Sequence, residues 1–199
     1  MPYGLPNISF IGYPLPVPCA AHGGLGFRVG LRADAGLVLD HFRRLSPLDR
    51  RQRFCATLAE AALARHAAEL WDQASIVLLA QDGPLWPAPP FRAGPVRALA
   101  EIAIAGSEAE IGVSVDATCR RRGLGGWLTR TAGFLLAPRG VTRLRAWTMP
   151  GNASMLALGR AHGARITTES GETEILFEVA TLRRDYLRRR APLLFREAG

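Results

Sequence analysis

Residues 113–126 read VSVDATCRRRGLGG, and this stretch decides how the rest of the chain is interpreted. The alternation at Val113, Ser114 and Val115 predicts a strand, and the glycines at 123–126 open an apolar helix. A strand that passes through a glycine-rich turn into a helix gathers unpaired backbone N–H groups at one point, and the helix dipole adds partial positive charge there. Glycine is needed because any Cβ would stand between those amides and a diphosphate. The stretch therefore predicts an anion site.

Two common phosphate-binding motifs do not fit this turn. A dinucleotide fingerprint starting at Gly123 requires glycine at position 128, where the chain has Leu128. A P-loop requires a Gly-Lys pair, but all 25 Lys+Arg residues of this chain are arginine. The absence of lysine also excludes Schiff-base catalysis, which needs a lysine amine.

Regular hydrophobic patterns continue on both sides of the turn, and the Gly106-Ser107 pair between two apolar runs predicts an antiparallel hairpin. Ser46 followed by Pro47 predicts a helix start. We expect strands over 26–31, 75–80, 96–105, 108–115, 142–148, 164–168 and 172–179. We expect helices over 33–45, 123–137 and 152–162, and either one helix or two separated by a break between 47 and 71.

The size and charge of the chain set the class of protein. With 199 residues, 48% of them hydrophobic, we expect one folded domain with its own core. The net charge of +8 has two explanations: biased codon usage in a chain rich in Ala, Gly and Arg, or nucleic-acid binding. A nucleic-acid binder clusters its cations, whereas these arginines are scattered, so nucleic acid is not the expected partner. A positive protein also attracts a polyanionic cofactor.

The cysteines and the first residues indicate the compartment. Cys19, Cys55 and Cys119 are odd in number and far apart, with no metal-ligand spacing, which predicts a reducing compartment and no structural metal. The first 20 residues have no basic segment and contain five prolines, so they do not fit a signal peptide. No apolar run reaches the roughly 18 residues of a membrane span. We expect a cytoplasmic protein that does not interact with membranes.

Two motifs resemble the GNAT superfamily of acyl-CoA-dependent N-acetyltransferases. The run RRRGLG at 120–125 fits R/Q-x-x-G-x-G/A, which is that superfamily's pyrophosphate loop. Asn152 before a helix that ends at Gly163 is similar to its second motif. Residues 42–47 with Arg53-Phe54 resemble the helical opening of the protein-lysine acetyltransferase subgroup. The resemblance covers roughly residues 26–168 and agrees with the order of the expected elements.

The resemblance implies an α/β (α+β) fold: a mixed, mostly antiparallel twisted sheet of about six to seven strands flanked by helices. It divides the chain into an irregular proline-rich arm (1–25), the acyltransferase domain (26–180) and an arginine-rich tail (181–199). The apolar arm packs either on its own domain or on a second subunit, so a homodimer stays open. The basic cluster at 183–190 is either a solvated helix face or a site for the cofactor's 3′-phosphate, an acidic acceptor or nucleic acid.

The resemblance also implies acetyl-CoA as co-substrate, without a metal, and an amine acceptor that is a protein lysine or a small molecule. In such folds an unpaired strand edge pairs with the pantetheine amides like an added strand. Asn152 either caps its helix or also contacts the pantetheine arm. The implied cofactor-binding residues are Val113, Val115, Arg120, Arg121, Arg122, Gly123, Leu124, Gly125, Gly126 and Asn152.

Transfer to an amine needs a group that accepts the amine's proton, and a partly buried acid with a raised pKa would suit it. Glu110 stands at the spacing of the general base proposed for the lysine-acetyltransferase subgroup, and the alternative is an exposed hairpin glutamate. Glu108 and Glu101 are the next candidates. Alternation places Gly112 and Ser114 on the face of Glu110, and we expect the small Gly112 to leave space for an acceptor.

One position departs from the resemblance. Many members of the superfamily carry a tyrosine seven residues after the Asn, where it protonates the leaving thiolate, but this chain has Gly159. Either water or another group serves, or the activity is weak. A non-catalytic domain that binds acyl-CoA and regulates another process is therefore the second interpretation.

Overall fold

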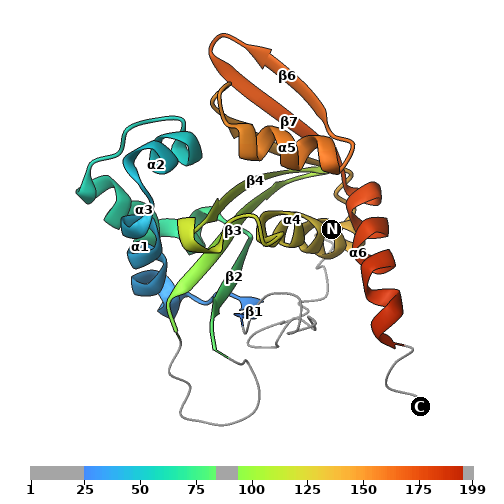
Figure 1. Ribbon diagram of the computed structural model, residues 1–199, viewed down its shortest axis with the longest axis horizontal. Coiled ribbons are helices and arrows are strands. Elements are labelled where there is room, and N and C mark those ends of the chain that lie inside the picture. The colour runs from blue at the N-terminus through green and yellow to red at the C-terminus, as the bar shows by residue number, and fades with distance from the viewer. Residues whose placement is uncertain (1–24, 84–93, 195–199) are drawn as a thin grey trace, which may run out of the picture.

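The computed structural model describes residues 25–83 and 94–194. Within these residues seven strands form one sheet in the order β1-β2-β3-β4-β5-β7-β6 (Figure 1). The strands are β1 (Leu25–Val29), β2 (Ile76–Asp82), β3 (Val96–Ala105), β4 (Glu108–Val115), β5 (Arg143–Thr148), β6 (Arg165–Glu169) and β7 (Glu172–Glu178). The helices are α1 (Ala35–Arg44), α2 (Pro47–Phe54), α3 (Glu60–Gln73), α4 (Leu124–Leu136), α5 (Ala153–Ala161) and α6 (Val179–Leu194), with the short 3-10 helices η2 (Arg32–Asp34), η3 (Ala117–Cys119) and η4 (Ala137–Arg139).

The sheet is antiparallel between all neighbours except β4 and β5, which run parallel. Helix α4 connects these two strands, as a parallel pair requires a crossover connection. The structure therefore confirms the predicted mixed, mostly antiparallel sheet flanked by helices.

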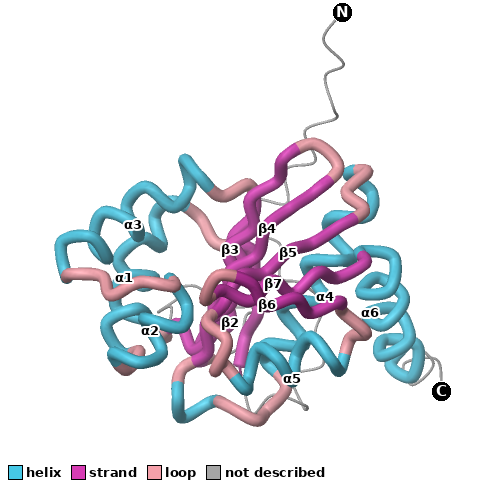
Figure 2. Tube along the Cα trace, turned by 90° about the horizontal axis from the view of Figure 1, so that it is seen from above, coloured by secondary structure: helices cyan, strands magenta, loops and turns pink. Residues whose placement is uncertain are grey.

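The helices lie on opposite faces of the sheet. Figure 2 shows α1, α2 and α3 on one side and α4 and α6 on the other. The first side is filled by a core that includes Phe42, Leu63 and Leu99, and the second by a core that includes Leu128 and Phe177, all of them fully buried. Because successive residues of a strand face opposite sides, the central strands contribute to both cores and are apolar on both faces.

Helix α2 is short and separate from α3, which settles the alternative that the sequence left open. Ser46 caps its start by accepting a hydrogen bond from the backbone N–H of Asp49 (3.1 Å). Cys55 ends it in the left-handed region at φ 52°, and α3 begins at Glu60. The break lets α2 turn toward the end of β5, where Thr148 Oγ1 donates to the carbonyl of Gln52 (3.4 Å).

Helix α6 is formed from the arginine-rich segment that follows β7. Its residues Leu182 and Tyr186 are buried, and Gly133 of α4 gives room for Leu182 because a Cβ there would occupy the same space. Tyr186 stacks on Phe134 with ring centroids 4.5 Å apart. The expected N-terminal arm lies outside the described residues. In the part of the chain that the structure describes, no helix is both long and apolar enough to cross a membrane.

Candidate functional site

The parallel strands β4 and β5 pair over a short distance and then part. Their pairs join Glu108–Glu110 to Arg143–Arg145, although both strands continue beyond them. The N–H of Asp116 donates to Arg97 O (2.8 Å), so alternation along this antiparallel ladder directs the backbone groups of Val113 and Val115 away from β3. The β4 edge therefore offers main-chain hydrogen-bonding groups to the gap between the strands.

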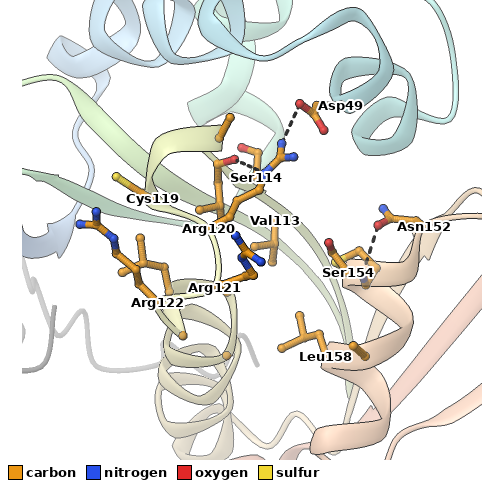
Figure 3. A pocket seen from close by; sticks show the side chains of 18 of the residues that line it. Asp49, Val113, Ser114, Cys119, Arg120, Arg121, Arg122, Asn152, Ser154 and Leu158 are labelled. Carbon is orange, nitrogen blue, oxygen red and sulfur yellow. Dashed lines mark hydrogen bonds and ion pairs between the residues drawn. The ribbon is translucent and has the colours of Figure 1, made fainter.

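A cleft of about 1030 Å³ occupies this gap. Its walls come from α2, the end of β4, the turn that follows β4, the first two turns of α4 and helix α5 (Figure 3). One residue of α6 also lines it. Val113 and Val115 line it together with the whole run from Arg120 to Gly126 and with Asn152. The structure thus brings all ten residues of the expected cofactor site to one cleft.

The turn before α4 is open. Gly123 precedes the helix at φ 78° and provides no side-chain cap, and the first helical hydrogen bond runs from Trp127 N to Gly123 O (2.9 Å). The N–H groups of Leu124, Gly125 and Gly126 have no acceptor within the helix. A Cβ at Gly123 would meet nothing within 4 Å. The N-terminus of α4 is therefore accessible to an anion, with the helix dipole behind it.

The three arginines of the turn differ in their surroundings. The guanidinium of Arg120 pairs with Asp49 of α2 (2.6 Å; Figure 3), and its Nε donates to Val115 O (3.4 Å). Although burial acts in the opposite direction, hydrogen bonds from Ser46 and Arg120 lower the pKa of Asp49. Arg121, at φ 57°, and Arg122 are exposed. The ion pair of Arg120 thus connects the turn to α2, whereas the charges of Arg121 and Arg122 lie at the solvent-exposed edge of the cleft.

Asn152 is used as a helix cap. Its Oδ1 accepts from Met155 N (3.2 Å) and its Nδ2 donates to Thr148 Oγ1 (2.7 Å). The side chain is buried at the wall of the cleft. These bonds fix the direction in which α5 leaves β5, so Asn152 helps to set the width of the gap.

Of the three candidate acids, Glu101 is bound in the interior. Its Oε2 lies 2.9 Å from His66 Nε2, and its Oε1 lies 2.8 Å from Nη2 of Arg53 without the alignment of a hydrogen bond. Although burial would raise the pKa of Glu101, Arg53 and His66 lower it overall. A general base of the expected kind has a raised pKa, so Glu101 does not have the expected property.

Glu108 and Glu110 stand on the same strand face in different surroundings. Glu108 pairs with Arg143 (3.2 Å) and Arg145 (2.9 Å). Glu110 is exposed, makes no ion pair within the described residues, and occupies the last β4–β5 pair before the strands part. Burial, together with nearby negative charge that includes Glu110, raises the pKa of the Cys55 thiol at the end of α2. Glu110 is therefore the candidate acid without an ion pair in the described residues, but it is exposed rather than partly buried as expected, and it does not line the cleft.

The expected free space at Gly112 is not there. The guanidinium of Arg53 from α2 occupies the position that a Cβ on Gly112 would take. Gly112 and Glu101 are partners in the β3–β4 ladder, so Arg53 lies over this pair and is held by the carboxylate. The missing side chain accommodates a residue of the protein itself, and the expectation of acceptor space was wrong.

A buried Ser114–His41 pair was missed by sequence reasoning. His41 of α1 is fully buried, with Nδ1 3.1 Å from Val96 O and Nε2 2.8 Å from Ser114 Oγ. Because a carbonyl only accepts, Nδ1 carries the proton and Ser114 donates to Nε2. Burial lowers the pKa of His41 to about 4, so the ring is neutral at pH 7. The spacing of His41 with Val38 and Phe42 on the apolar face of α1 was a usable signal for its burial.

Gly159, the departure from the superfamily pattern, lies where α5 packs closely on the β6–β7 hairpin. A Cβ there would lie 2.8 Å from Ile175 and 3.2 Å from Ile166. The position has no room for a tyrosine in this packing.

Comparisons with known proteins identify the fold. The sequence matches no protein-family model and no curated protein. Among solved structures, the GNAT domain of S. lividans PAT superposes with a TM-score of 0.62 at 20% identity, covering 77% of this chain and 90% of that one. The ribosomal-protein-S18-alanine N-acetyltransferase from Escherichia coli gives 0.55 at 17%, covering 78% and 94%.

A third structure was determined with its ligand. The PaiA N-acetyltransferase from Thermoplasma acidophilum, in complex with coenzyme A, gives a TM-score of 0.57 at 11% identity, covering 77% of this chain and 98% of that one. Each of the three matches covers more than three quarters of this chain. The chain has the fold of the GNAT N-acetyltransferases.

Proposed function

We propose that the chain is an acyl-CoA-dependent N-acyltransferase that moves an acetyl group from acetyl-CoA to an amine. One observation carries the proposal: the open glycine turn and the free edge of β4 line the same cleft. A Cβ on Gly125 would lie 4.0 Å from the side chain of Val113, so the two features are neighbours. A diphosphate suits the first and an extended chain of amides suits the second. The GNAT fold supports the same conclusion.

In this proposal the main chain holds the cofactor. The N–H groups of Leu124, Gly125 and Gly126 bind the diphosphate, and the exposed charges of Arg121 and Arg122 add attraction. The gap-facing backbone groups of Val113 and Val115 pair with the pantetheine amides as an added strand would. Arg120 and Asn152 act mainly through position, since their side chains are bound to Asp49 and to Thr148.

Glu110 is the proposed general base, and Glu108 and Glu101 are weaker candidates because both are ion-paired. The ammonium of the acceptor loses a proton to Glu110 directly or through water, and its nitrogen attacks the thioester carbonyl. The gap-facing N–H of Val113 is the donor available to the oxyanion. The nitrogen then loses its second proton to water and the C–S bond breaks. The thiolate takes up a proton from the same water, the neutral amide leaves, and Glu110 returns its proton to solvent. This is direct attack in a ternary complex.

The acceptor is a primary amine, and a protein lysine is the first candidate. Arg53 fills the space over Gly112, so the acceptor does not bind at that glycine. The resemblance of residues 42–47 to the protein-lysine acetyltransferase subgroup favours the same class.

A non-catalytic acyl-CoA-binding regulator is the second candidate, favoured by Gly159 and by the position of Arg53. Calorimetry with acetyl-CoA and an acetyl-transfer assay against a lysine peptide, an N-terminal amine peptide, spermidine and an aminoglycoside separate the two. The enzyme transfers acetyl groups to at least one amine, whereas the regulator binds acetyl-CoA without turnover. Because the chain has no lysine, every acetyl-lysine detected belongs to the acceptor.

A further inference from the structure

The end of the cleft away from α2 is lined by basic side chains from three helices. Arg130 comes from α4, His162 from the end of α5 and Arg189 from α6. Arg189 belongs to the segment that sequence analysis set apart as a tail. Helix α6 is therefore part of the wall of the same cleft that holds the open turn.

Arg130 folds back across the first turn of α4. A Cβ on Gly126 would lie 3.1 Å from Nη1 of Arg130 and 3.4 Å from Nε2 of His162. The lack of a side chain at 126 thus gives the guanidinium its place. Its charge lies beside the unpaired N–H groups at the start of the helix.

This guanidinium has no carboxylate at ion-pair distance within the described part of the chain. Its polar contact is His162 Nε2 (3.5 Å), while His162 Nδ1 lies 3.4 Å from Asp185 Oδ2. Because an ionised carboxylate only accepts, His162 carries its proton on Nδ1 and accepts from Arg130 through Nε2. Asp185 therefore makes no ion pair with Arg130, although its charge attracts the guanidinium.

The position of Arg130 is unfavourable for a positive charge. Burial, together with the like charge of Arg189, lowers the pKa of Arg130 to about 10, so the guanidinium is still charged at pH 7. A half-buried cation next to a second cation is stabilised when an anion neutralises both. Two arginines beside a helix N-terminus match the geometry and charge of a phosphate group.

We infer that Arg130 and Arg189 form a subsite for a phosphomonoester, the 3′-phosphate of CoA. The inference rests on the proposed function, in which the diphosphate already occupies the turn at 123–126. The 3′-phosphate is attached to the ribose next to that diphosphate and carries the highest charge density of the cofactor. The subsite makes the protein select CoA over dephospho-CoA and gives α6 a role in cofactor recognition.

Calorimetry with CoA, dephospho-CoA and adenosine 3′,5′-bisphosphate tests the subsite. We expect wild-type protein to bind CoA about tenfold more tightly than dephospho-CoA, as charge-assisted hydrogen bonds predict. Arg189→Gln weakens CoA about fivefold, and the Arg130→Gln/Arg189→Gln pair removes the preference for CoA while leaving the Kd for dephospho-CoA within about twofold of wild type. Arg188→Gln is the matched control, since exposed Arg188 is on α6 but does not line this cleft.

Three results overturn the inference, and they differ in what else they affect. Equal binding of CoA and dephospho-CoA by the wild type removes the subsite and leaves the proposed function intact. Equal weakening of both ligands by the double variant assigns Arg130 to the diphosphate instead. Failure of all three ligands to bind removes the cofactor cleft, and with it both the proposed function and the subsite.

Discussion

One side of the cleft is formed mainly by main-chain groups and the other mainly by side chains. On the side of the proposed cofactor, glycines and a strand edge expose main-chain groups, and the turn is open at Gly123. On the side of the proposed acceptor, side chains fill the space: Arg53 covers Gly112 and is held by Glu101. Main chain recognises a constant ligand without depending on many residue types, whereas side chains can differ from one chain to another. The sequence predicted the open turn and the strand edge because both are formed by neighbouring residues, and it was wrong about the space at Gly112 because a distant residue fills it.

The largest expected effect is on the acceptor side, at Glu110. Glu110→Gln removes the proton acceptor while preserving shape, so we expect kcat to fall about 10²–10⁴-fold. The Kd for acetyl-CoA stays within about twofold, because the cofactor side is unchanged. Initial rates with the best acceptor and calorimetry measure the two quantities.

Glu108→Gln is the matched control for that experiment. Glu108 lies two residues away on the same strand face but is paired with Arg143 and Arg145. A loss of rate as large in the Glu108 variant as in the Glu110 variant contradicts the assignment of the base.

The next effect concerns the stability of the acceptor side. Glu101→Gln leaves the guanidinium of Arg53 and the ring of His66 without their anion, and breaking such a buried pair costs about 3 kcal/mol. We expect the free energy of unfolding, measured in urea, to fall by that amount. Glu178→Gln, at an exposed residue of β7, should change it by less than about 0.5 kcal/mol. Equal values for the two variants would show that the Glu101 cluster does not hold α2 on the sheet.

On the cofactor side, Gly125→Asp places a carboxylate beside the proposed diphosphate. Like-charge repulsion and lost access should weaken CoA about 100-fold, equivalent to about 2.7 kcal/mol. Gly125→Ala is the matched control, since its Cβ would meet only Leu158 and Val113, at 3.9 and 4.0 Å. If both variants bind CoA as the wild type does, the diphosphate does not lie at this turn.

The smallest expected effect is a dependence of the free energy of unfolding on pH, caused by buried His41. The pKa of His41 is about 4 in the folded protein and near 6.5 when unfolded, so the unfolded state binds the extra proton between these values. The contribution of His41 to the free energy of unfolding is fully present above pH 6.5. It falls as the pH decreases toward 4, at about 1 kcal/mol per pH unit or less.

Urea unfolding across this pH range measures the slope, and His41→Asn provides the comparison because its amide can still donate to Val96 O. The variant should lose part of the slope. An unchanged slope in that variant would assign the pH dependence to the carboxylates whose pKa is lowered in the fold, such as Glu101 and Asp116.

Local signals were enough to predict most of the fold. The β3–β4 hairpin was predicted with the bounds that the structure has, because alternation and the Gly106-Ser107 turn act over a few residues. The start of α2 at Pro47 followed from the Ser46 cap. The end of α2 at Cys55 could not be predicted, since no glycine or asparagine marks the left-handed residue there.

Contacts between distant residues limited the prediction of the site. The turn at 120–126 and the alternation of β4 are local, so the open turn and the strand edge could be predicted from the sequence. That Arg53 fills the space over Gly112, and that His41 bonds Ser114, depends on how α1 and α2 pack on the sheet. No spacing along the chain encodes either contact.

The central claim is that exposed backbone amides at the start of α4 hold the diphosphate of CoA. An amide-resolved NMR titration of 15N-labelled protein with CoA tests it most directly. The account predicts that the largest shifts fall on the N–H groups of Leu124, Gly125 and Gly126, with Val113 also affected. Saturable CoA binding that leaves these four amides unshifted would contradict it.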